Sequence, residues 1–120
     1  MRLTFVETEI FTRRILSLGL EEGLRRLQLE LLASPEAGDV DPGTGGLRKL
    51  RMADERRDKG RRGGARVHYL WLPHRSLVYL LYVYTKGEAS TLTMSQKREL
   101  RAVVAAIKVA SSGQQVGRNR

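Results

Sequence analysis

Two apolar runs, each as long as a β-strand, most constrain what this chain can fold into. ARVHYLWL occupies residues 65–72 and LVYLLYVYT occupies residues 77–85, with Pro73 in the short connection between them. Closely spaced strand-like runs predict an antiparallel hairpin. Both runs carry large apolar residues on both faces, which is typical of strands that helices cover on each side.

Apolar periodicity predicts two helices before this hairpin. LTFVE at residues 3–7 indicates a short first strand, and Thr8 can cap a helix that starts at Glu9 and breaks at Gly19. Leucines at helical spacing continue as a second helix over residues 20–33, which ends at the Ser-Pro dipeptide of residues 34–35. The N-terminal third is therefore expected to form a helical hairpin.

The remaining segments complete a single α+β domain. Residues 34–47 are rich in glycine and proline and indicate a loop, LRKLRM at residues 47–52 indicates a strand, and a charged loop follows it. Residues 93–96, TMSQ, form a capping box that opens a helix to about Ala110. The predicted order is β-α-α-β-β-β-α, a small antiparallel sheet in a domain over residues 1–110, with a polar and disordered tail over residues 111–120.

Positive charge is concentrated in the middle of the chain. The whole sequence has a net charge of +9, yet residues 1–46 hold 5 basic and 8 acidic residues. Residues 47–66 hold 9 basic and 3 acidic residues. Such a patch favours a polyanion partner, above all nucleic acid, although a solvated charged surface is the alternative.

Several functional classes are disfavoured by the residues present. The glycine-rich segment GDVDPGTGGLRK lacks the GxxxxGK[ST] spacing of a phosphate loop and the acidic spacing of an EF-hand, so its glycines are interpreted as a turn into a strand. With no cysteine and two histidines, we expect no metal site and no cofactor. The longest apolar run, residues 77–84, is far shorter than the ~20 residues of a membrane helix, so we expect a cytoplasmic protein without a membrane partner.

Cations and phenols converge on one end of the predicted hairpin. Arg66 and His68 share a face of their strand, and Tyr82, Tyr84 and Lys86 share a face of the next. Pairing of these strands brings Arg66, and Arg62 in the loop before it, close to Tyr84 and Lys86. We interpret His68 as a structural residue.

Such a cluster suits RNA cleavage without a metal. The ribose 2′-hydroxyl is the nucleophile, and arginines stabilise the charge that develops on the phosphate. The base is either Tyr84 or Lys86, because neighbouring cations favour the neutral form of a lysine. The alternative is that the tyrosines only pack the sheet and that Lys86 is solvated.

Three segments in order resemble a known family. GDVDPGTGGLRKLR, KGRRGGARVHYLWL and LYVYTKGEASTLTMSQK are similar, in order and spacing, to the HigB branch of the RelE/ParE toxin superfamily. The resemblance runs from about Phe5 through the terminal helix. It implies a RelE-like fold and a bacterial toxin that enters the ribosomal A site and cuts messenger RNA, leaving a 2′,3′-cyclic phosphate.

The resemblance also implies partners and site residues. The partners are the ribosome with its mRNA and a cognate helix-turn-helix antitoxin similar to HigA, through which alone operator DNA is bound. By motif, Lys59, Arg62 and Arg66 match the basic segment, and Tyr84, Lys86 and Glu88 match the last. We take as catalytic candidates Lys59, Arg62, Arg66, Tyr84 and Lys86. The candidates for RNA binding are Arg48, Lys49, Arg51, Arg56, Arg57 and Arg61.

This chain departs from the family pattern at three positions. Gly87 replaces a common asparagine, Thr91 replaces a common aspartate, and His68 stands where an aliphatic residue is common. Some superfamily members keep the fold and poison gyrase instead. A gyrase-poisoning toxin and a non-catalytic basic nucleic-acid-binding module are therefore the alternatives.

Overall fold

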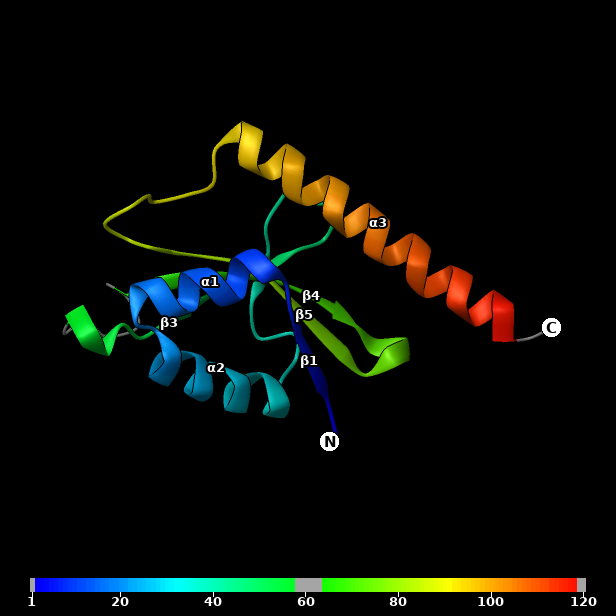
Figure 1. The fold of residues 1–120 in the computed structure, drawn as a ribbon, viewed down its shortest axis with the longest axis horizontal. Helices are drawn as coiled ribbons and strands as arrows, with labels where there is room; N and C mark the ends of the chain where they lie inside the picture. Colours follow the sequence, from blue (N-terminus) through cyan, green and yellow to red (C-terminus); the bar gives the residue numbers. More distant parts are fainter. Residues whose placement is uncertain (1, 58–63, 119–120) are drawn as a thin grey trace.

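The protein is an α+β fold, seen in a computed structural model that describes residues 2–57 and 64–118, with side chains to residue 112 (Figure 1). Within these residues, a five-stranded sheet has the order β1-β5-β4-β3-β2. The strands are β1 (Thr4–Glu7), β2 (Asp39–Val40), β3 (Arg48–Met52), β4 (Ala65–Leu72) and β5 (Leu77–Thr85). The helices are α1 (Glu9–Leu18), α2 (Glu21–Ala33) and α3 (Met94–Arg118), with short 3₁₀ turns η1 (Glu55–Arg57) and η2 (Pro73–Arg75).

The β4–β5 hairpin forms the centre of the sheet, and its bounds confirm the sequence prediction. The strands are antiparallel, with Ala65 opposite Thr85 at one end and Leu72 opposite Leu77 at the other. The register shifts between His68 and Tyr69, which leaves one extra residue on β5. Such a bulge lets an apolar run serve both faces without strict alternation.

The sheet is mixed, so the prediction of an antiparallel sheet was wrong at one edge. β1 pairs with β5 in parallel, from Thr4 opposite Leu77 to Glu7 opposite Leu80. These strands are far apart in sequence, so no hairpin turn sets their relative direction. Contacts at the start of α1 hold this edge, since the Thr8 backbone N–H donates to the Leu80 carbonyl at 3.1 Å. The two-residue strand β2 also lies inside the segment that was expected to be loop.

Helices α1 and α2 cover one face of the sheet as the predicted helical hairpin. Thr8 caps α1 by accepting from the Phe11 N–H, and Gly19 ends it in the left-handed region at φ 69°. Both helices turn a buried apolar stripe towards the sheet, and it packs against β3, β4 and β5. The core residues contributed by these helices and their junction are Phe11, Ile15, Leu20, Leu24, Leu27 and Leu31.

Helix α3 lies over the opposite face and is longer than predicted. Thr93 and Gln96 form the expected capping box, with reciprocal bonds of 2.9 and 3.0 Å. Val104 packs with Leu47, Leu70, Leu72 and Leu81 in a second core cluster. The helix continues to Arg118, beyond the end that was expected at about Ala110. No proline interrupts this stretch, and the buried Ser111 hydroxyl contacts His74 Nε2 at 3.0 Å.

Candidate phosphate-binding face

The three motifs of the sequence meet on the α3 side of the sheet. Register places Arg51 of β3 opposite Arg66 of β4, and Arg66 opposite Tyr84 of β5. Two residues further along each strand, a second row on the same face contains Lys49, His68 and Tyr82. Residues directly opposite one another in a sheet share a face, so this surface brings cations and aromatic rings together. We call these six residues the basic–aromatic face.

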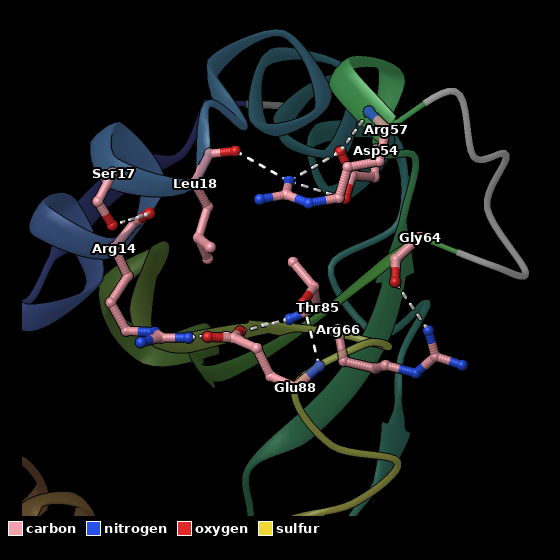
Figure 2. Close-up of polar contacts among 9 residues, drawn as sticks. All are labelled: Arg14, Ser17, Leu18, Asp54, Arg57, Gly64, Arg66, Thr85 and Glu88. Atoms are coloured by element: carbon pink, nitrogen blue, oxygen red, sulfur yellow. Dashed lines mark hydrogen bonds and ion pairs between the residues drawn. The ribbon is translucent and has the colours of Figure 1, made fainter.

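The predicted proximity of Arg66, Tyr84 and Lys86 is confirmed. Arg66 and Tyr84 are cross-strand partners, and the Lys86 backbone N–H donates to the Gly64 carbonyl at 3.1 Å. The Arg66 guanidinium also donates to the Gly64 carbonyl at 3.1 Å (Figure 2). Lys86 is exposed, whereas Arg66 is buried. Three further candidates, Lys59, Arg61 and Arg62, lie outside the described residues.

Tyr84 is a buried phenol whose hydroxyl lacks a hydrogen-bond partner among the described residues. Its side chain is 2% exposed. Burial raises the pKa of Tyr84, and the positive charge of Arg66 only partly opposes this rise. The phenol is therefore protonated at neutral pH and is a hydrogen-bond donor, which fits a general acid better than a base.

Glu88 holds the turn that follows β5 (Figure 2). Its carboxylate accepts from the Thr85 backbone N–H at 2.8 Å, and its own N–H donates to the Thr85 hydroxyl at 3.3 Å. Arg14 of α1 donates to the same carboxylate at 2.6 Å. Burial alone would raise the pKa of Glu88, but these hydrogen bonds outweigh it and lower the pKa. Gly87 replaces a common asparagine in the turn that carries Lys86, yet bonds of Glu88 to Thr85 and to Arg14 hold this turn in place.

The remaining predicted RNA-binding arginines lie on the side of the helical hairpin. Arg48 donates to the Gly38 carbonyl at 2.8 Å, and Arg57 donates to the Leu18 carbonyl at 3.0 Å. Arg56 packs so closely against Gly19 that a Cβ there would collide with its guanidinium. Arg48 thus joins β3 to the loop after α2, and the other two join η1 to the end of α1. Lys49 and Arg51, in contrast, share the basic–aromatic face. Arg51 is exposed in the part of β3 that β2 does not pair, and at this edge it also borders a hollow of about 200 Å³ against α2.

The glycine-rich segment before β3 is a turn, as its sequence predicted. Gly43, Gly45 and Gly46 have φ values of 84°, 79° and 110°, which side chains disfavour. The loop carbonyls accept from α3, because Lys97 donates to Pro42 at 3.0 Å and Lys108 donates to Gly45 at 3.0 Å. These helix cations therefore stabilise the docking of α3 in this structure.

Sequence reasoning missed a polar pair beneath α3. His68, with no exposed surface, contacts the Asp41 carboxylate through Nε2 at 2.8 Å, and Lys97 donates to the other carboxylate oxygen at 3.2 Å. The sequence contains one signal, a histidine at a position where the resembling proteins commonly carry an aliphatic residue. Nothing in the chain order shows that Asp41 and His68 meet.

The chain matches no protein-family model. The likeness to the HigB branch therefore rests on the three motifs described above. In the described residues, no three His, Cys, Asp or Glu side chains gather as a metal site would require. None of the helices described is both long enough and apolar enough to cross a membrane.

Proposed function

We propose that this protein is a ribosome-dependent mRNA endonuclease that acts as the toxin of a type II toxin–antitoxin pair. The observation that carries the proposal is the register that sets Arg66 opposite Tyr84, with Arg51 on the far side of Arg66. This register brings the three family-like segments to one end of the sheet. The net charge of +9 suits a polyanionic substrate.

In the proposed chemistry the RNA supplies its own nucleophile, the ribose 2′-hydroxyl, so the main task of the protein is to bind and orient the phosphate. The guanidinium of Arg66 stabilises negative charge on the scissile phosphate, and the Tyr84 hydroxyl donates a hydrogen bond. Lys86 and Arg51, both exposed, bind the flanking backbone. Arg66 and Tyr84 are buried, so the proposed cleavage requires both side chains to become accessible when RNA binds.

Primer extension on mRNA from cells that express the protein tests this proposal. Cuts inside translated regions that disappear when translation is blocked are the expected result. Intact RNA with cleaved DNA would instead indicate a gyrase poison. Intact RNA and DNA, together with tight RNA binding, would indicate a non-catalytic binding module.

Variants of two arginines separate the site from general charge. Arg66→Ala is expected to lower cleavage by about 10²–10³-fold, without loss of the folded state. Arg25→Ala removes the same charge from the exposed surface of α2 and is expected to leave cleavage unchanged. Growth arrest that persists in a folded Arg66→Ala protein would contradict the proposed site.

The proposed antitoxin gives an independent test. We expect a short neighbouring gene for a helix-turn-helix protein similar to HigA, which binds this chain and operator DNA. Co-expression should abolish growth arrest, and the complex should co-purify. Arrest that is unaffected by such a neighbour would argue against the toxin–antitoxin assignment.

A further inference from the structure

The Asp41–His68 pair lies next to Tyr84 on the basic–aromatic face. His68 projects from β4, and Asp41 comes from the glycine-rich turn before β3. The imidazole stacks on the Tyr84 ring, with centroids 5.9 Å apart and planes at 24°. A buried histidine with an acidic partner on one nitrogen and an aromatic neighbour therefore sits beside the phenol of the proposed site.

The hydrogen bond to Asp41 determines the tautomer of His68. Burial would raise the pKa of Asp41, but bonds from His68 and Lys97 hold it below its usual value, so this group is a carboxylate that can only accept. The proton of neutral His68 is therefore on Nε2, which leaves a lone pair on Nδ1. In the described residues, Nδ1 has no hydrogen-bond partner.

The charged groups around His68 favour its neutral form. Burial lowers the pKa of His68, the bond to Asp41 opposes that effect, and the positive charges of Lys49 and Lys97 lower it further. Two tyrosines of β5 complete the surroundings: Tyr82 lies opposite His68, and Tyr84, whose pKa is raised by burial, stacks on the imidazole ring. An unprotonated imidazole thus adjoins a protonated phenol, and groups with such divergent environments are typical of acid–base pairs.

We propose that His68 is the general base of RNA cleavage at this site and that Tyr84 is the general acid, with Asp41 as the residue that orients the imidazole. This inference rests on the proposed function, which does not name a general base, and supplies that base. It does not follow from the family resemblance, because the resembling proteins commonly carry an aliphatic residue at position 68.

The proposed step balances without any further reactant. His68 has no exposed surface in this structure, so the step requires its ring to become accessible to RNA. His68 Nδ1 then takes the proton of the ribose 2′-hydroxyl, and the 2′-oxygen forms a bond to phosphorus. The bond from phosphorus to the 5′-oxygen breaks, and that oxygen takes the phenolic proton of Tyr84. The products are a 2′,3′-cyclic phosphate and a 5′-hydroxyl, and proton exchange with water restores both side chains.

The state of His68 is measurable without any RNA. Long-range ¹H–¹⁵N NMR of the full chain separates the two tautomers, and His74→Gln assigns the signals because the chain has two histidines. We expect a neutral ring at pH 7 with the proton on Nε2, and titration below about 6.5. A ring that is charged at pH 7, or protonated on Nδ1, would overturn the proposal.

Cleavage kinetics on programmed ribosomes test the roles of the two side chains. His68→Phe keeps an aromatic ring against Tyr84 and removes the base, so cleavage should fall by about 10²–10⁴-fold. The acidic limb of the pH–rate profile should disappear with it. In Asp41→Asn that limb should move to lower pH, because Asp41 raises the pKa of His68.

A substrate with sulfur in place of the scissile 5′-oxygen tests the role of Tyr84 as general acid separately from that of the base. Its leaving group needs no proton, so Tyr84→Phe should recover most of its cleavage rate on this substrate, whereas His68→Phe should not. Circular dichroism and thermal unfolding check that both variants fold. His68→Val, which carries the aliphatic type seen in the resembling proteins, replaces His68→Phe if the latter is unfolded.

The outcomes distinguish this inference from the proposed function. If the wild-type protein cleaves no RNA on ribosomes, both are overturned. If it cleaves and His68→Phe is equally fast with an unchanged pH profile, only the base assignment fails. If Tyr84→Phe is equally impaired on both substrates, only the acid assignment fails.

Discussion

Two buried tyrosines on opposite faces of the sheet differ in how their hydroxyls are satisfied. Tyr69 faces α1 and α2, donates to the Pro35 carbonyl at 2.8 Å and accepts from the Gly38 N–H at 2.9 Å. Tyr84 faces the α3 side, and among the described residues its hydroxyl has no partner. Burial raises the pKa of both.

The basic residues on the two faces of the sheet also differ in the contacts that their side chains make. On the side of the helical hairpin, Arg48 and Arg57 satisfy loop and helix carbonyls. On the other side, Lys49 and Arg51 stand in rows with aromatic residues. Buried polar groups are usually paired, so on that side the Tyr84 hydroxyl, which has no partner among the described residues, draws attention to function. The comparison separates a structural half of the basic patch from a candidate functional half.

The largest expected effects come from replacing Tyr69 and Tyr84, each in turn, by phenylalanine. Tyr69→Phe leaves the Gly38 N–H and the Pro35 carbonyl without their partner, so the free energy of unfolding should fall by about 1–3 kcal/mol, with cleavage per folded molecule unchanged. Tyr84→Phe removes a hydroxyl that has no hydrogen-bond partner among the described residues, so stability should hold or rise while cleavage falls by about 10²-fold or more. Urea unfolding and single-turnover kinetics measure both, and equal losses of stability would break the distinction.

Arg14 tests whether the turn after β5 is held from α1. It donates to the Val83 carbonyl at 2.6 Å and to Glu88, and its guanidinium lies 5.1 Å from the centre of the Tyr82 ring. Arg14→Ala should lower the free energy of unfolding by about 1–2 kcal/mol. Arg13→Ala, at the exposed neighbouring position, is the matched control. Similar values for the two variants would mean that these contacts contribute nothing measurable.

The salt dependence of RNA binding sharpens the division of the cations. Arg51→Gln and Lys86→Gln should each reduce the slope of log K against log salt by about 0.7 for single-stranded RNA, with no change in stability. Arg25→Gln, on the outer surface of α2, should leave the slope unchanged. Fluorescence anisotropy over a salt series measures it, and an equal change for Arg25→Gln would indicate binding by net charge alone.

The smallest expected effect is the contribution of His68 to acid sensitivity. The unfolded chain protonates this residue near pH 6.5, whereas burial lowers the pKa of His68 in the fold. Between these two values the unfolded state binds more protons, so the free energy of unfolding falls as the pH falls. The lowered pKa values of Asp41 and Glu88 extend the loss to more acidic pH.

Urea unfolding from pH 7 to pH 5 measures this slope. His68→Phe should flatten the curve just below pH 6.5 and leave the more acidic part in place. An unchanged curve would show that His68 has the same pKa in both states. His74→Gln, which removes the other histidine and its contact with the Ser111 hydroxyl, is the comparison variant.

Local signals in the sequence were reliable where a few neighbouring residues decide the structure. The bounds of β4 and β5, the Thr8 cap, the Gly19 stop and the Thr93–Gln96 capping box all follow from contacts within one turn or one strand. The proximity of Arg66 and Tyr84 followed from a short connection between strands. Each of these features depends on residues that are close in the chain.

Features that depend on distant segments were missed. The parallel pairing of β1 and the meeting of Asp41 with His68 join elements whose order in the chain does not reveal their contact. The same holds for the arginines, because composition alone does not distinguish Arg57, bound to the Leu18 carbonyl, from the exposed Arg51.

The sequence by itself determined the elements, the central hairpin and the place where the basic and tyrosine motifs meet, because period, caps and turn residues act over short distances. Only the tertiary structure decided which polar groups are satisfied. Carbonyls of the loop after α2 accept from Arg48 and Tyr69, and the last carbonyl of α1 accepts from Arg57. On the other face, burial under α3 gives His68 one acidic partner and leaves the second ring nitrogen unpaired within the described residues, which is the physical basis for the proposed base.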